Sequence, residues 1–186
     1  MNSKKRIIKI VFLANLLALG VILNIVENYI TFPIPVPNAK IGLANVVTLV
    51  IIYLYSWKEG YAIAILRVIL ATALSGRWAL FPMSMLGMVL ATTTMVMLRY
   101  SKRVSIIVVS IAGSIMHAVG QILGASLFVV HSIAPIVHLP LMLVVSIVAG
   151  IVTGVVADRV LYIIKKRIST EVTTEVVEET PTDGNS

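Results

Sequence analysis

The longest uncharged stretch of the chain runs from Val104 to Ala157 and reads VSIIVVSIAGSIMHAVGQILGASLFVVHSIAPIVHLPLMLVVSIVAGIVTGVVA. It contains no Asp, Glu, Lys or Arg over 54 residues. As one helix it would measure about 80 Å, far more than the roughly 30 Å of a bilayer's hydrocarbon core. The stretch must therefore fold back, and prolines and histidines between His131 and Pro140 mark the reversal. We infer one membrane-spanning helix on each side of that reversal.

Four shorter apolar segments precede this stretch, so the sequence predicts an all-α, polytopic integral membrane protein with six transmembrane helices. Each span needs about 20 predominantly apolar residues. The composition agrees: 12% of the residues are charged, where soluble domains carry about 25%, and the mean hydropathy is +1.01. The transmembrane domain is predicted to cover residues 1–168, with spans at about 7–27, 41–57, 60–76, 79–98, 104–130 and 137–164.

Basic residues predict the orientation of these spans, because Lys and Arg concentrate in cytoplasmic loops. With six spans, twelve of them fall on one side and only Lys40 and Arg77 on the other. Both termini are therefore predicted to lie in the cytoplasm, at the cell membrane. The first segment begins like a signal peptide, but its apolar run continues to Val26, which favours a retained helix. The twelve basic residues on the predicted cytoplasmic side are Lys4, Lys5, Arg6, Lys9, Lys58, Arg99, Lys102, Arg103, Arg159, Lys165, Lys166 and Arg167.

Residues 169–186, STEVTTEVVEETPTDGNS, carry five of the eight acidic residues and no periodic apolar face. They predict a disordered acidic tail in the cytoplasm. The net charge of +7 is placed in loops beside the membrane, so it does not indicate nucleic-acid binding. The chain has no cysteine, no phosphate-binding glycine loop, no dinucleotide fingerprint and no HExxH, and its three histidines are scattered. We therefore expect no metal and no cofactor.

Polar side chains within the spans carry the functional information, because lipid-facing helices need none. Arg67 lies about 13 Å above Lys58, near the middle of the bilayer, where an unpaired arginine costs at least about 2.5 kcal/mol. His117 and Gln121, one helical turn apart, point into the same interior space. The residues predicted to line an outward-facing substrate-binding cavity are Asn24, Glu27, Asn45, Arg67, His117 and Gln121.

A purely structural role is the alternative for these residues. Arg67 would then bond backbone carbonyls or pair with Glu27, while His117 and Gln121 would satisfy each other. Small residues of the last two spans also follow helical stripes, which favour close packing of neighbouring backbones over function. The stripes are Ser110, Gly113, Gly120 and Gly124 on one span, and Ser146, Gly150, Thr153, Gly154 and Ala157 on the other.

Three alternating prolines stiffen residues 31–40 into an extended strap, which could cover the mouth of the predicted cavity.

The segment from Pro33 to Thr48, PIPVPNAKIGLANVVT, resembles a known family. Lys58-Glu59, Leu66-Arg67 and GSIMHAVGQ at 113–121 extend the resemblance over about residues 7–164. The chain is similar to small bacterial membrane proteins called Gx transporters, also known as heptaprenyl diphosphate synthase component I.

That family is in turn similar to the substrate-binding S components of energy-coupling-factor transporters. The resemblance implies an S-component-like bundle of six helices with an outward pocket for a small-molecule or lipid-like ligand. It also implies a coupling subunit with partner ATPases, docked on small residues of the first helix, which are Ala14 and Ala18 here.

The alternative takes the synthase name literally and gives the chain a place in prenyl-quinone metabolism. Prenyl diphosphate elongation needs paired Asp clusters that hold Mg²⁺ and diphosphate. Asp158 is the one aspartate of the predicted membrane domain, so we expect no enzyme activity from this chain by itself. The alternative function is a non-catalytic membrane component associated with heptaprenyl diphosphate synthase.

Overall fold

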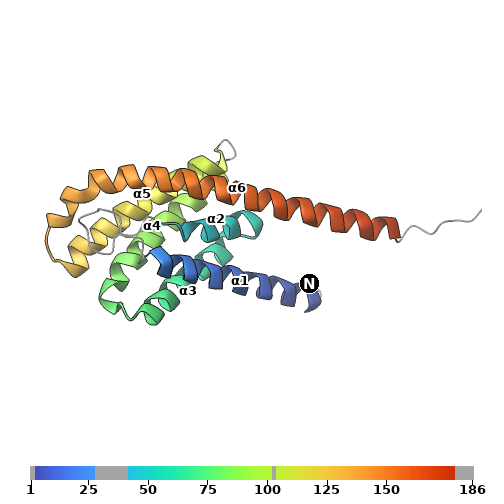
Figure 1. Ribbon diagram of the computed structural model, residues 1–186, viewed down its shortest axis with the longest axis horizontal. Helices are drawn as coiled ribbons and strands as arrows, with labels where there is room; N and C mark the ends of the chain where they lie inside the picture. Colours follow the sequence, from blue (N-terminus) through green and yellow to red (C-terminus); the bar gives the residue numbers. More distant parts are fainter. Residues whose placement is uncertain (1–2, 28–41, 102–103, 179–186) are drawn as a thin grey trace, which may run out of the picture.

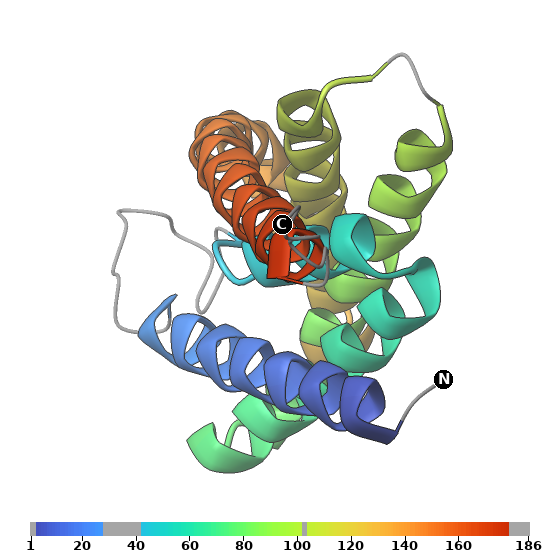
Figure 2. The ribbon, with the colours of Figure 1, turned by 90° about the vertical axis from the view of Figure 1, so that its right-hand side faces the viewer.

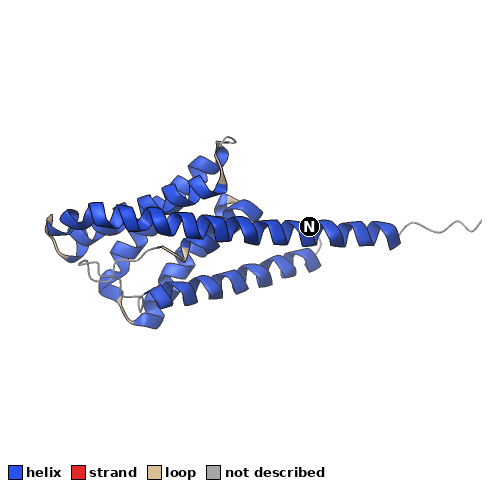
Figure 3. Ribbon diagram, turned by 45° about the horizontal axis from the view of Figure 1, so that its top comes forward, coloured by secondary structure: helices blue, strands red, loops and turns tan. Residues whose placement is uncertain are grey.

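The computed structural model describes residues 3–27, 42–101 and 104–178, which fold into a bundle of α-helices (Figure 1, Figure 3). No strand occurs within these ranges, so the all-α prediction is confirmed. Turns of 3₁₀-helix at Trp78–Leu80 and Ala134–His138 and a π-helical turn at Ala125–Val129 connect the later helices. The six helices are α1 (Ser3–Glu27), α2 (Asn45–Leu54), α3 (Trp57–Ser75), α4 (Phe81–Tyr100), α5 (Ile106–Gly124) and α6 (Leu139–Glu178).

Local signals in the sequence explain where several helices begin and end. The Ser56 hydroxyl accepts a hydrogen bond from the Lys58 backbone N–H and caps α3. At the other end of α3, Gly76 adopts a left-handed conformation with φ of 67°. Ser105 caps α5 in the same way as Ser56, by accepting from the backbone N–H of Val108. Each cap satisfies a backbone group that the helix itself leaves unpaired.

Four helices are long and apolar enough to cross a bilayer, within the part of the chain that the structure describes. They cover residues 6–27, 78–100, 106–129 and 134–167, so the chain is a multi-pass membrane protein. The helices in the other two predicted spans do not meet both conditions. Helix α2 has only 10 residues, a length of about 15 Å. Helix α3 has 19 residues, but it carries Lys58, Glu59 and Arg67.

Helix α2 is shorter than the predicted span at 41–57 because turns interrupt both of its ends. Gly42 has φ of +90°, a conformation that side chains other than glycine rarely adopt. Its carbonyl accepts a hydrogen bond from the Asn45 backbone N–H, which closes a turn just before the helix. At the other end, Tyr55 leaves the helical region before Ser56 caps α3. Six membrane crossings therefore remain a prediction.

The end of α6 differs from the expected tail. Composition predicts disorder from residue 169, but the structure instead continues the helix to Glu178. A helix that is already formed extends one residue at a time without a new nucleation step, so polar residues can prolong it. Residues 179–186 lie outside the described part of the chain, as does the predicted strap at 31–40.

The small-residue stripes bring α4, α5 and α6 into backbone contact. A Cβ atom on Gly120 of α5 would lie 2.6 Å from the Gly87 Cα of α4. On α6, a Cβ atom on Gly150 would lie 2.6 Å from the Ile111 Cα of α5. The hydroxyls of Ser110 and Thr153 add a hydrogen bond of 2.8 Å between α5 and α6. These positions act in packing, as the structural interpretation of the stripes expects.

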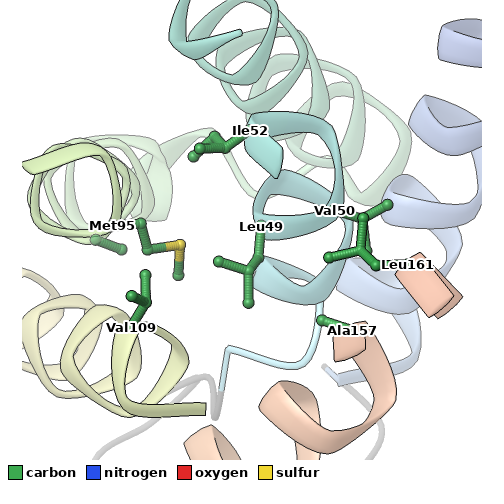
Figure 4. Close-up of a cluster of buried hydrophobic side chains, with 8 residues drawn as sticks. Leu49, Val50, Ile52, Met95, Val109, Ala157 and Leu161 are labelled. Carbon is green, nitrogen blue, oxygen red and sulfur yellow. The ribbon is translucent and has the colours of Figure 1, made fainter. Parts of the chain in front are cut away.

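The largest cluster of buried apolar side chains surrounds the short helix α2 (Figure 4). Leu49 and Ile52 of α2 are fully buried there, against side chains from α4, α5 and α6. Helix α1 instead lies on the outside of the bundle, along α3 and α2 (Figure 2). The core residues are Leu49, Val50, Ile52, Ala91, Met95, Val109, Ala157 and Leu161.

Candidate functional site

The turn that begins α2 brings three of the predicted site residues together. The Glu27 carboxylate, at the end of α1, accepts a hydrogen bond from the Leu43 backbone N–H. Arg67 of α3 donates from one guanidinium nitrogen to the Ala44 carbonyl oxygen. Its other terminal nitrogen lies 3.3 Å from the Asn45 side-chain oxygen. The start of α2 is thus held by one acidic and one basic side chain from two different helices.

His117 of α5 lies against the same turn, and Gln121 lies beside it on α5. Their side chains form a hydrogen bond of 2.9 Å, between the Gln121 amide nitrogen and the His117 Nε2. A Cβ atom on Gly42 would lie 3.4 Å from the His117 ring and 2.8 Å from the Asn45 amide nitrogen. The histidine ring and the Asn45 amide therefore both lie against Gly42. We call Glu27, Asn45, Arg67, His117 and Gln121 the polar cluster.

Every member of the polar cluster is buried. Their exposed fractions do not exceed 6%, and those of Arg67 and Gln121 are 1% and 0%. Asn24, the sixth predicted site residue, is 5% exposed and lies one helical turn before Glu27 on α1. The structure brings the other five together from four helices, although they are far apart in the sequence.

Glycines make room for these bulky polar side chains. A Cβ atom on Gly20 of α1 would lie 3.1 Å from the Arg67 Cδ, so the aliphatic part of the arginine packs against the α1 backbone. On α4, a Cβ atom on Gly87 would lie 3.0 Å from the Gln121 Cγ and 3.2 Å from the His117 ring. The backbones of α1 and α4 are therefore shaped around the cluster.

Several buried polar atoms on helices of the polar cluster have no hydrogen-bond partner among the described residues. They are the Asn45 amide nitrogen, the Arg67 Nε and the hydroxyls of Thr48 and Ser114. A buried polar atom left without a partner costs about 1–3 kcal/mol, so native proteins satisfy nearly all of them with protein, water or a bound molecule. The four atoms belong to three helices of the polar cluster: α2, α3 and α5.

Sequence reasoning missed Thr48 and Ser114. Both were detectable in principle, because each lies three residues from a site residue on the same helix face: Thr48 after Asn45, and Ser114 before His117. Each is 1% exposed. Hydroxyls are common on transmembrane helices, where they often bond their own backbone, so spacing alone does not separate a site hydroxyl from a packing one.

The polar cluster contains two charges of opposite sign, on Glu27 and on Arg67. Glu27 is close enough to Arg67 for their charges to attract. Arg67 also bonds a backbone carbonyl, as the structural alternative expects. Within the described residues, no three His, Cys, Asp or Glu side chains lie together as a metal site would require. The arrangement suits hydrogen bonding to a polar molecule.

The predicted docking residues Ala14 and Ala18 are exposed on α1. Large apolar side chains on the same helix, such as Ile10, Val11 and Ile22, are more than half exposed. Helix α1 therefore presents an apolar face with two small residues away from the bundle.

The far end of α1 is attached to α3 by an ion pair. The Lys9 ammonium lies 2.5 Å from the Glu59 carboxylate, which also accepts a hydrogen bond from the Ser56 hydroxyl. Lys9 further lies 5.0 Å from the centre of the Tyr55 ring. The bond from Lys9, followed by that from Ser56, lowers the pKa of Glu59 from 4.5 to about 2.

This ion pair predicts a pH-dependent stability. Because the pKa of Glu59 is lower in the folded than in the unfolded chain, the pair stabilises the fold above about pH 4.5, and this is lost as the pH falls towards 2. The gain stays below about 1 kcal/mol, since both side chains are partly exposed. We expect Glu59→Gln to melt below the wild type at pH 7, with a smaller difference at pH 3. An equal difference at both pH values would contradict this assignment.

Comparison with known proteins places most of the bundle in one family. The family model described as heptaprenyl diphosphate synthase component I matches residues 16–160, a range that contains the complete polar cluster. Searches of curated proteins and of solved structures found no significant match. The matched range covers more than half of the chain, from α1 to α6. The chain therefore belongs to the heptaprenyl diphosphate synthase component I family.

Proposed function

We propose that this protein is the substrate-capturing subunit of a membrane transporter, similar in role to an S component. The observation that carries the proposal is the polar cluster: five buried polar side chains from four helices, on which further polar atoms have no partner among the described residues. Packing alone would be served better by apolar side chains, since buried charges stabilise a fold poorly. The presence of these polar side chains inside an apolar bundle favours a binding role.

The chemistry of the open positions favours a particular kind of ligand. The Asn45 amide nitrogen and the Arg67 Nε are donors only, and hydroxyls such as that of Thr48 can donate as well. A ligand with hydrogen-bond acceptors, such as carbonyl, carboxylate or ring nitrogen atoms, would satisfy them. Arg67 and Glu27 carry charges of opposite sign, which cancel, so the ligand need not carry a net charge. We infer a small polar or amphipathic solute.

The position of the cluster supports capture from outside the cell. Glu27 ends α1, whereas the basic residues Lys4, Arg6 and Lys9 lie near its start. About 27 Å of helix separates Lys9 from Glu27, close to the thickness of the hydrocarbon core. If basic residues mark the cytoplasmic side, the cluster belongs to the outer half of the membrane and both termini lie inside.

Transport against a gradient would need energy from partner subunits, because this sequence has no nucleotide-binding motif. The exposed face of α1 with Ala14 and Ala18 is the proposed docking surface for a coupling subunit and its ATPases. Small residues spaced by four let another helix approach closely within a membrane.

The test is co-purification from the native membrane. We expect the wild-type protein to bring down a coupling subunit with ATPases, and Ala14→Leu/Ala18→Leu to reduce their recovery at least about ten-fold by removing close approach. The control is Ala62→Leu/Ala73→Leu, which adds the same bulk at two exposed alanines of α3. Equal recovery with both double variants would rule out docking through this face, and absence of any coupling subunit with wild type would contradict the transport role.

The family description favours a second candidate function, a non-catalytic partner of a prenyl diphosphate synthase. Such a protein would anchor the enzyme or present a prenyl lipid at the membrane. Deletion of the gene distinguishes the two functions: loss of long-chain quinone would support this candidate, and normal quinone content would eliminate it.

A further inference from the structure

A pocket lies between the start of α5 and the last membrane turns of α6, at the basic end of the bundle. Its volume is about 260 Å³, slightly below the roughly 300–1,000 Å³ of sites for drug-sized molecules. Leu161, at 2% exposure, is buried beneath it. The lining residues are Ile106, Asp158, Arg159, Leu161, Tyr162 and Lys165. The pocket thus combines an apolar base with charged walls.

The charges of this pocket favour an anion. Arg159 and Lys165 contribute two positive charges and Asp158 one negative charge. Neither basic side chain forms an ion pair with any side chain that the structure describes. Arg159 presents a planar guanidinium fork and Lys165 a compact ammonium, which are the two groups that proteins use to bind phosphate. A group with one net negative charge would balance the pocket.

The surface next to the pocket indicates that the anion carries a hydrocarbon chain. Val148, Val152 and Val155 are 59%, 51% and 43% exposed. They continue with Arg159 and Tyr162 at alternating spacings of four and three, so all five lie on one stripe of α6. The stripe from Val148 to Arg159 is about 16 Å long, close to the depth of one bilayer leaflet. An acyl chain can lie along the valines while its headgroup enters the pocket.

We propose that this pocket binds the phosphate headgroup of an anionic phospholipid, with one acyl chain along the valine stripe of α6. Tyr162, with an apolar ring and a polar tip, suits this boundary between lipid and water. The site is separate from the polar cluster, and the inference does not depend on a transport function.

The test uses the full-length protein in detergent and titration with phosphatidylglycerol, followed by native mass spectrometry. We expect Arg159→Gln/Lys165→Gln to weaken phosphatidylglycerol binding about ten-fold relative to wild type. Both side chains are exposed, so this variant should fold normally. The matched control is Lys4→Gln/Lys58→Gln, which removes two exposed positive charges elsewhere and should change binding less than about two-fold.

Two further arms separate lipid from other sources of the same chemistry. Phosphatidylcholine should bind more weakly than phosphatidylglycerol, because its headgroup has no net charge. An excess of inorganic phosphate should leave phosphatidylglycerol bound, because phosphate lacks the chain that contacts the valine stripe. The proposal is overturned if the control variant loses as much binding as the pocket variant, if the two lipids bind equally, or if inorganic phosphate displaces the lipid.

Discussion

Arg67→Met is expected to lower the free energy of unfolding by about 3 kcal/mol, one of the two largest effects among the variants considered. Methionine keeps most of the length of the side chain and its packing against Gly20. It removes the hydrogen bonds to the Ala44 carbonyl and to the Asn45 side chain, and it leaves Glu27 without the opposing charge of Arg67. Ala44 and Asn45 are buried, so the loss of a hydrogen-bond partner there costs free energy of folding.

Thermal unfolding in detergent measures this effect. Arg77→Met is the matched control, because Arg77 is exposed next to the short turn between α3 and α4. We expect the free energy of unfolding of the control to lie within about 1 kcal/mol of the wild-type value, as is usual for surface substitutions. If Arg67→Met unfolded at the same temperature as the control, the arginine would not hold the start of α2 and the description of the cluster would be wrong.

Gly120→Val is the second variant with a large expected effect. A Cβ atom at this position would lie 2.6 Å from the Gly87 Cα and 2.8 Å from the Leu86 carbonyl oxygen. Both are backbone atoms of α4, so the clash cannot be relieved by turning a side chain. The helices must separate, which also disturbs the contacts of Gly87 with His117 and Gln121. We expect a loss of about 3 kcal/mol or failure to form a monodisperse protein.

Ala73→Val is the control for this substitution, because Ala73 lies exposed on α3. Size-exclusion profiles and melting temperatures in detergent compare the two variants. A Gly120→Val protein as stable and as monodisperse as Ala73→Val would show that α4 and α5 do not approach as closely as the structure has them.

The sequence is sufficient to place most of the polar cluster in the interior. Arg67 occurs in a span without acidic neighbours at the same depth, and His117 and Gln121 share one helix face, so an interior position follows from the cost of exposing them to lipid. The predicted spans also put Glu27 and Asn45 at a similar depth in the membrane. How they meet is a tertiary property: the contact depends on Gly42, whose positive φ turns the chain just before α2.

Other features could not be read from the sequence for physical reasons. Hydropathy detects apolar residues but not turns, so the predicted span at 41–57 hides the short α2. Composition predicted disorder after residue 169, since it does not include the advantage of extending an existing helix. The pocket between α5 and α6 is lined by Ile106 of α5 and Asp158 of α6. These two residues lie together because the glycines of α6 contact the α5 backbone and set the register of the two helices.

The central claim is that the polar cluster binds a small molecule, and ligand retention tests it most directly. Wild-type protein, gently purified from its native membrane, is analysed by mass spectrometry beside Arg67→Ala and His117→Ala, with Arg77→Ala and His131→Ala as controls at exposed positions. We predict a small molecule that the wild type and both controls retain and that both cluster variants lose. Equal retention by His117→Ala, Arg67→Ala and the wild type would contradict the account.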